Sequence, residues 1–201
     1  PRPDLAGRPG LNPLRFSEEF HITGEHMRAL EEIAKSTGIN AQREASIAEG
    51  FDSKSDGFVF GKHTFYENEQ EYQLTKVHRG DMERIKASIK DARLQSDYVC
   101  VSIHSHKLGN GRKDYPAQFL QDFAYECIDA GAIAILGHGP HIMRGIELYN
   151  GGIIFYSLGD FIFQNDTPSH LPADFYSQYG LCNDDLIGKA IRTRSKDQTI
   201  G

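Results

Sequence analysis

The chain has 201 residues, with 22 Lys and Arg against 28 Asp and Glu, so its formal net charge is −6. This acidic balance argues against a nucleic-acid-binding protein, which needs a basic face for the phosphate backbone. With 39% hydrophobic and 10% aromatic residues the chain can bury a core, and its length predicts one compact domain. It holds no apolar run close to the length of a membrane-spanning helix. Its three widely spaced cysteines form no disulfide framework.

The first 80 residues give weaker patterns than the rest. Residues 1–22 are punctuated by proline and glycine and show neither a strand nor a helix period, which predicts a connecting arm. A helix is expected from Thr23, its N-cap, to Thr37, with Gly38 ending it. Residues 39–80 are polar with loosely alternating phenylalanines, which predicts one or two strands.

From residue 81 onward the sequence predicts alternating helices and strands. Asp81 is placed to cap one helix, and residues 98–103 form an apolar, β-branched run typical of a buried strand. Pro116 suits the first turn of the next helix, and residues 132–136 are the next strand. This order is a β-α-β unit with two parallel strands. Asn150-Gly151 lies between two apolar runs and predicts a hairpin turn.

Four histidines follow the two predicted parallel strands. His104 and His106 come after the first strand, and His138 and His141 come after the second. Ligands of open α/β sheets bind beyond the carboxyl ends of parallel strands, and imidazole is a common ligand of zinc, iron and manganese. Two glycines and a proline in the segment 137–141 suit a rigid loop close to an ion. The alternative is that these histidines bond backbone groups at strand ends without any ion.

Two other features of the sequence bear on chemistry, a basic loop and the cysteines. The loop 107–113 contains Lys107, Arg112 and Lys113, and it either grips an anionic substrate or is a solvated basic loop. The Gly-x-Ser-x-Gly elbow of serine hydrolases is absent from the sequence. Cys100 and Cys127 fall inside a strand and a helix stripe, which predicts small core residues.

Four linked segments together resemble one known family. They are residues 97–104, 128–131, 137–141 and 156–161, and residues 10–15 are similar in a looser way. In this order and spacing they resemble the CapA-type capsule, or poly-γ-glutamate, synthesis family, which belongs to the calcineurin-like metallophosphoesterase superfamily. The match covers roughly residues 81–166.

The resemblance implies a mixed α/β fold of two packed sheets flanked by helices, here its C-terminal half, with a site for two divalent ions. The domain layout is then a connecting arm at 1–22, the C-terminal half of the metallophosphoesterase-like domain at 23–166, and a C-terminal extension at 167–201. His104 and His138 match ligands of one ion and would be catalytic, and His141 matches a ligand of the other. Manganese, zinc, iron and magnesium are not distinguished.

The chain departs from the family pattern in three respects. The family's N-terminal motifs, Gly-Asp, Asn-Leu-Glu and Asn-Asn-His, are not found. His106 stands where glycine is usual, and Asp160 stands where asparagine is usual; both are candidates for a second shell around the metal. We therefore expect these 201 residues to bind metal weakly, to lack hydrolase activity until an N-terminal segment is restored, and to expose the sheet face that such a segment would cover.

The resemblance implies two alternative functions. The first is metal-dependent hydrolysis of a phosphoester or γ-glutamyl amide in the biosynthesis or turnover of an anionic polymer. The second is a non-catalytic assembly or export factor of a polymer synthase complex. The family points to the cell envelope, with membrane association through a segment outside this chain, and a cytoplasmic location is the alternative.

Overall fold

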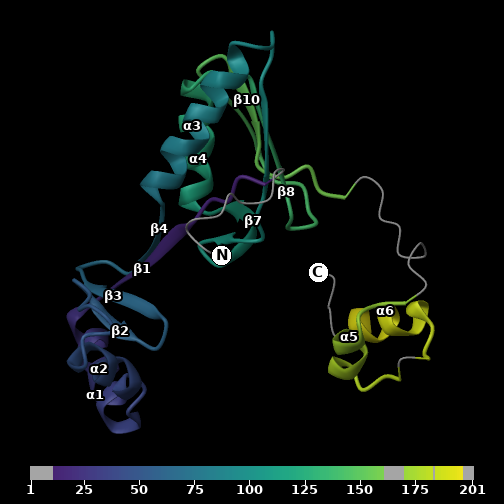
Figure 1. Cartoon of the computed structure of the whole chain (residues 1–201). Coiled ribbons are helices and arrows are strands. Elements are labelled where there is room, and N and C mark those ends of the chain that lie inside the picture. Colours follow the sequence, from purple (N-terminus) through teal and green to yellow (C-terminus); the bar gives the residue numbers. More distant parts are fainter. Residues whose placement is uncertain (1–10, 161–169, 183, 197–201) are drawn as a thin grey trace. The chain divides into compact units, whose positions relative to one another are not determined.

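The computed structural model describes residues 11–160, 170–182 and 184–196, in two compact units rather than the single domain expected from length. The first unit spans Pro1–Gly159 and the second spans Asp160–Gly201. The second unit contains the helices α5 (Ala173–Gln178) and α6 (Ile187–Lys196), with Tyr176 and Ala190 buried. The fold is mixed α/β, as predicted (Figure 1). No helix among the described residues is long and apolar enough to cross a membrane.

The first sheet of the larger unit has the strand order β2-β3-β1-β4, so β1 lies inside it. β1 runs parallel to β3 and antiparallel to β4. The connecting arm predicted for residues 1–22 is therefore wrong for 16–22, which form a strand held by partners 45 to 61 residues later in the chain. The strands are β1 (Phe16–Ile22), β2 (Phe58–Phe60), β3 (His63–Glu67) and β4 (Tyr72–Val77).

Two helices lie beside this sheet (Figure 1). α1 (Gly24–Thr37) confirms the predicted helix, including the Thr23 N-cap and the left-handed Gly38 at its end. α2 (Ala41–Ala48) was not predicted, and it has no buried residue. The segment 39–80 thus contains a helix and three strands where one or two strands were expected. A helix this short, with no buried face, gives little hydrophobic periodicity to detect.

The second sheet has the order β5-β8-β10-β9 and contains the predicted β-α-β unit. β5 pairs with β8 in parallel, and β8 with β10 in parallel. The Asn150-Gly151 turn joins β9 to β10, with positive φ at both residues, which confirms the hairpin. The strands are β5 (Cys100–His104), β8 (Ala134–His138), β9 (Ile146–Tyr149) and β10 (Gly152–Phe155).

The main core lies between one face of this sheet and the helices α3 (Arg79–Arg93) and α4 (Gln118–Asp129). Met82, Ile154 and Cys127 are fully buried there. On the other face, two apolar residues of the edge strand β9 are exposed, Leu148 at 81% and Ile146 at 58%; that an N-terminal segment covers this face stays a prediction. β5 is an edge strand whose Cys100, Ser102 and His104 are exposed. It is therefore not the fully buried strand that its composition predicts.

A small hairpin of β6 (Leu108–Gly109) and β7 (Arg112–Pro116) lies between β5 and α4 in the chain. The prediction that Pro116 opens a helix is wrong, because Pro116 ends β7 and α4 starts two residues later. The N-cap residue of α4, Ala117, offers no side-chain hydrogen bond. Instead, the amide of Phe119 donates to the buried hydroxyl of Thr75 in β4, 3.0 Å away. A distant strand thus satisfies a donor at this helix start.

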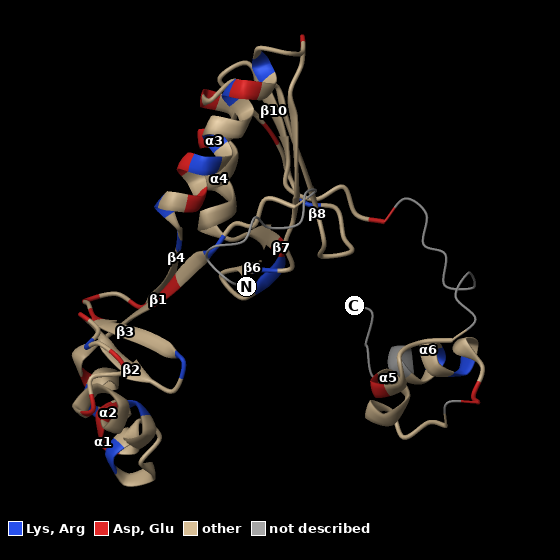
Figure 2. Ribbon diagram, viewed as in Figure 1, with Lys and Arg blue, Asp and Glu red and all other residues tan. Residues whose placement is uncertain are grey.

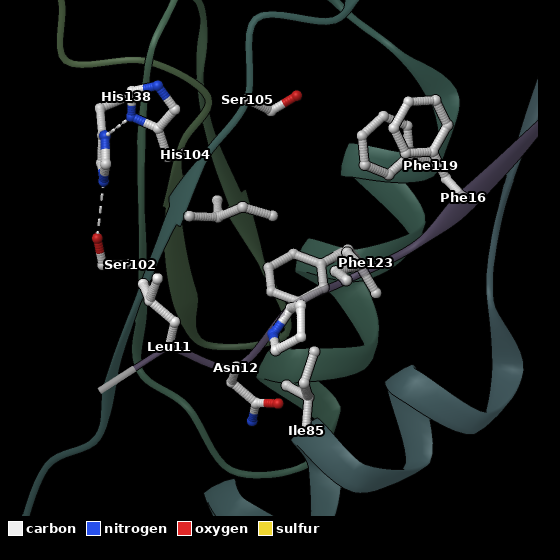
Figure 3. Close-up of a pocket in the computed structure, with 13 residues that line it drawn as sticks. Leu11, Asn12, Phe16, Ile85, Ser102, His104, Ser105, Phe119, Phe123 and His138 are labelled. Atoms are coloured by element: carbon white, nitrogen blue, oxygen red, sulfur yellow. Dashed lines mark hydrogen bonds between the residues drawn. The ribbon is translucent and has the colours of Figure 1, made fainter. Parts of the chain in front are cut away.

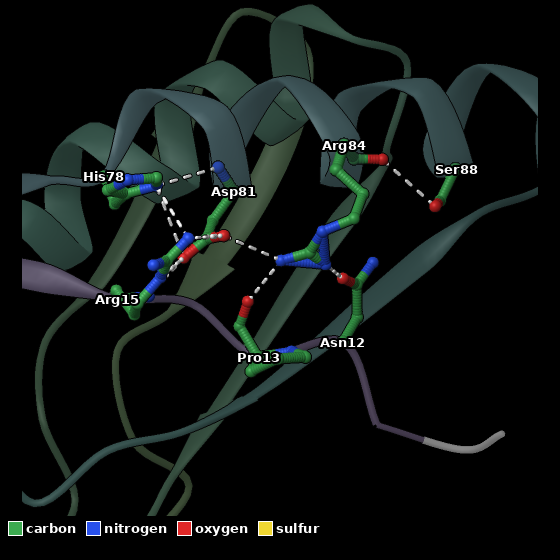
Figure 4. Close-up of polar contacts among 7 residues, drawn as sticks. All are labelled: Asn12, Pro13, Arg15, His78, Asp81, Arg84 and Ser88. Carbon is green, nitrogen blue, oxygen red and sulfur yellow. Dashed lines mark hydrogen bonds and ion pairs between the residues drawn. The ribbon is translucent and has the colours of Figure 1, made fainter. Parts of the chain in front are cut away.

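Asp81 anchors the chain that leads into β1 (Figure 4). Its carboxylate accepts bonds from the amide, Nε and Nη2 of Arg15 at 2.8–2.9 Å and from Arg84 at 3.1 Å. Asp81 is therefore not the N-cap of α3 that the sequence predicts. The N-cap is His78, whose ring accepts from the Asp81 amide. The Arg15 guanidinium beside Asp81 holds the pKa of that carboxyl well below its ordinary value.

This lowered pKa makes the anchor sensitive to acid. A carboxyl with a depressed folded-state pKa contributes stability that is fully present above its unfolded pKa, about 3.9, and that is lost as pH falls through the folded value. We expect Asp81→Asn to lower the urea midpoint at pH 7 and to flatten the fall in stability between about pH 5 and pH 2. Asp56→Asn, at an exposed position, is the control. Parallel acid profiles for wild type and Asp81→Asn would contradict the prediction.

Candidate metal centre

The β-α-β unit brings the histidines predicted from the sequence together at one edge of the second sheet. β5 ends at His104 and β8 ends at His138, and the two residues are directly paired in the parallel register. The strands therefore reach the histidines themselves rather than stopping before them. His106 and His141 lie on the loops that follow. Parallel strands place their carboxyl ends on one edge, which is why residues 34 positions apart meet.

Hydrogen bonds link three of the rings in a row. Nδ1 of His104 and Nδ1 of His138 are 2.8 Å apart, and Nε2 of His104 and Nε2 of His106 are 3.1 Å apart. At the other end, the Ser102 hydroxyl lies 2.9 Å from Nε2 of His138. A neutral imidazole has one donor and one acceptor. If Ser102 donates to His138, each ring can donate to the next, and all three rings are satisfied while uncharged.

The fourth histidine, His141, contacts the row of rings through His106. The ring centroids of His106 and His141 are 5.5 Å apart. The loops that carry them approach closely, because the Ser105 amide donates to the His138 carbonyl at 2.9 Å. Gly139 has φ of 127°, and a Cβ there would lie 2.8 Å from the Ser105 carbonyl oxygen. Only glycine allows this approach. The sequence-based expectation that His104, His138 and His141 gather at one place is confirmed, with His106 between them.

Burial and the neighbouring His104 both lower the pKa of His138. A lowered pKa favours the neutral ring, which is the form that binds a metal ion. His104 and His106 are more exposed than His138. The lowered pKa thus favours in His138 the chemical state that a divalent transition metal needs.

The donors fit a metal in kind but do not complete a site. Among the described residues, no three His, Cys, Asp or Glu side chains are placed to hold one ion together. Nδ1 of His104 and Nδ1 of His138 point at each other at 2.8 Å, whereas two ligands about 2.1 Å from one tetrahedral ion lie roughly 3.4 Å apart. The rings would have to turn to share an ion, and further donors would have to come from outside the described residues.

A pocket of about 560 Å³ opens beside the histidines (Figure 3). His104, His138 and Ser102 line one side of it. The stacked rings of Phe16 and Phe119, with centroids 4.2 Å apart, line another. The remaining lining residues come from the segment leading into β1, from α3, α4 and β5, and from the loop after β5, namely Leu11, Asn12, Pro13, Leu14, Ile85, Ile103, Ser105 and Phe123. The pocket is mostly apolar, with polar groups at the histidine end.

The basic loop 107–113 uses two of its cations within the fold. Lys107 pairs with Glu18 of β1, and Arg112 pairs with Asp114 on the same strand. Figure 2 shows the basic colour on β7, where Arg112 and Lys113 lie. Because two of its three basic side chains are neutralised by carboxylates, the solvated-loop interpretation describes this segment better than an anion grip does.

Ser102 is a site residue that the sequence analysis did not single out. It lies two positions before His104 on β5, so the period of two puts both side chains on one face. That alternation could have identified it. Asp160 is exposed and belongs to the second unit. Its contact with a histidine therefore stays a prediction, as does the metal-binding role of His104, His106, His138 and His141.

Comparison with known proteins identifies the family. The model of the bacterial capsule synthesis protein PGA_cap matches residues 25–165. The uncharacterized protein y4sH of Sinorhizobium fredii (strain NBRC 101917 / NGR234) is 30% identical over the whole chain, which covers 41% of that protein. The capsule biosynthesis protein CapA of Bacillus anthracis is 31% identical over 70% of the chain and 31% of its own length. The PGA biosynthesis protein CapA of Bacillus subtilis (strain 168) is 41% identical over 37% of the chain and 19% of its own length.

These matches agree with the resemblance that the four linked segments gave, and they extend it to most of the chain. The chain spans less than half the length of the curated relatives that it matches throughout. The chain belongs to the PGA_cap family of bacterial capsule synthesis proteins, which has the calcineurin-like fold.

Proposed function

We propose that this chain carries the histidine side of a metal-dependent hydrolase centre that acts in capsule biosynthesis or turnover. The proposed substrate is a phosphoester or a γ-glutamyl amide of an anionic polymer. The observation that supports it is the row Ser102, His138, His104 and His106 at the carboxyl ends of two parallel strands. The name of the family supports the polymer context.

The residues that would hold metal are His104 and His138 on one ion and His141 on a second. Divalent ions at such a centre polarise a phosphoryl or amide oxygen and supply hydroxide near neutral pH. Histidines bring no negative charge, so a carboxylate donor is needed as well. We place it in the additional length that the curated relatives have.

The chain's own residues prepare the site in two ways. The Ser102 hydroxyl orients the His138 ring and selects which ring nitrogen carries the proton. Burial and the neighbouring His104 lower the pKa of His138, which favours its neutral ring. The aromatic side of the pocket, with Phe16 and Phe119, would shield one side of a bound substrate from water.

The alternative proposal is a non-catalytic assembly or export factor of a polymer synthase complex. One observation favours it: the described residues include no group of three donors placed around one ion. The two proposals differ in a measurable way, since only the enzyme turns over substrate in a metal-dependent manner.

The deciding experiment uses the full-length natural protein and the 201-residue chain in parallel. Each is stripped of metal with a chelator, reloaded with manganese or zinc, and assayed on bis-p-nitrophenyl phosphate and on a γ-glutamyl anilide. We expect metal-dependent turnover in the full-length protein and weak metal binding without turnover in the chain. If the full-length protein binds metal but hydrolyses neither substrate class, the assembly-factor proposal is favoured.

A further inference from the structure

Arg144 is a buried cation in the loop between β8 and β9. It is only 5% exposed. Its Nε donates to the Lys113 carbonyl at 2.9 Å, and its Nη2 donates to the Lys107 carbonyl at 3.0 Å. One guanidinium therefore holds the residue before β6 and the second residue of β7, from 37 and 31 residues away in the sequence.

These contacts join the loop that carries His106 to the loop that carries His141. These two residues are the outer histidines of the cluster. Lys107 directly follows His106 on the loop after β5, and its amide donates to the Ser105 hydroxyl at 3.2 Å. Arg144 lies three residues after His141 on the loop after β8. A shift of Arg144 would therefore move the backbone next to His106 relative to the loop of His141.

The loop that carries Arg144 is itself tightly held. His141 has φ of 59°, in the left-handed region, and a non-glycine residue stays in that region only when its surroundings fix it. The Arg144 amide donates to the Ser157 carbonyl at 3.1 Å, and the Ser157 hydroxyl donates to the Ile142 carbonyl at 2.7 Å. The loop is thus fixed to the strand end after β10 on one side and to the His106 loop on the other.

Burying the Arg144 guanidinium costs free energy, because the charge is removed from water. Nη1 of Arg144 is buried and has no hydrogen-bond partner among the described residues, and burial lowers the pKa of the guanidinium. An apolar side chain would avoid this desolvation cost. What arginine adds is a rigid planar fork that can hold two carbonyl groups at a fixed spacing.

We propose that Arg144 is a positioning residue that holds the His106 loop against the His141 loop and so sets the spacing of the outer histidines. The consequence for metal affinity rests on the function proposed above, whereas the consequence for the ring positions does not. The test therefore reads both in the 201-residue chain.

The variants are Arg144→Met, which keeps the length of the side chain but removes its donors, and Arg144→Lys, which keeps the charge but loses the fork. In the metal-free chain, NMR should show a ring-to-ring nuclear Overhauser effect between His106 and His141 in wild type. We expect this effect to be lost in Arg144→Met and weakened in Arg144→Lys. We also expect zinc affinity, measured by calorimetry, to fall by about tenfold in Arg144→Met, at the lower end of the loss typical of residues around metal ligands.

Ile135→Val is the matched control, since it loosens the core of the same sheet without touching either loop. If the contact of the His106 and His141 rings survives in folded Arg144→Met, or weakens equally in Ile135→Val, the positioning role is overturned. Arg144→Lys retains charge and volume, so it tests the role even if Arg144→Met fails to fold. Absence of zinc binding in the wild-type chain would contradict the weak binding expected of these residues, while the ring contact would still test the role of Arg144.

Discussion

The His138→Ala variant is expected to lose zinc or manganese affinity by more than about 100-fold in the full-length protein, because losses of about 10- to 100-fold already follow changes in the residues around metal ligands. His138 contacts His104 through Nδ1 and Ser102 through Nε2. Its loss would remove one donor and leave the His104 ring without its partner. Calorimetric titration of the chelator-treated protein measures the affinity, and turnover on a phosphodiester measures the consequence.

Two further variants show whether the loss belongs to the cluster. Ser102→Ala should have a smaller effect, about 10- to 100-fold, because it removes the group that orients the His138 ring and leaves the ring in place. His63→Gln changes an exposed histidine of β3 in the other sheet and should have no effect. Equal affinity for wild type and His138→Ala would show that the four histidines are strand-end residues without a metal.

The largest loss of stability is expected for Phe119→Ala, which should lower the free energy of unfolding by about 3–5 kcal/mol. Phe119 is 2% exposed and stacks on Phe16 with an interplanar angle of 4°. The backbone amide of Phe119 donates a hydrogen bond to the Thr75 hydroxyl. The ring therefore joins α4 to the start of β1, and its removal leaves a cavity between the core and the first sheet. Urea denaturation followed by far-ultraviolet circular dichroism measures the loss.

The matched variant is Phe51→Ala, at a phenylalanine that is 83% exposed. Its effect should stay within about 0.5 kcal/mol. Comparable losses for the two variants would show that the Phe16–Phe119 stack does not stabilise the larger unit. The Phe119→Ala substitution should also remove one wall of the pocket beside His104. The metal affinity of this variant should therefore be measured without urea, at a temperature at which it is folded.

The sequence alone determined the elements that are set by residues close to one another in the chain. The helix over residues 24–37 is defined by its own caps, Thr23 and Gly38, and the hairpin by the backbone preference of Asn150-Gly151. The β-α-β order was enough to place His104 beside His138, because right-handed crossovers leave few alternatives. Local patterns and one topological rule thus suffice to predict the histidine cluster.

Only the tertiary structure decided the features that depend on distant partners. β1 has no clear period of its own and is a strand because β3 and β4 satisfy its backbone on both sides. The Thr75 hydroxyl accepts from the Phe119 amide at the start of α4, 44 residues away. Asp81 lies inside α3, which begins at Arg79, and binds Arg15 instead of capping the helix. Likewise, whether His104 and His138 can share one ion depends on their ring directions and on further donors. Sequence spacing brings the rings to one edge, but the hydrogen bonds formed there decide which way their nitrogens point.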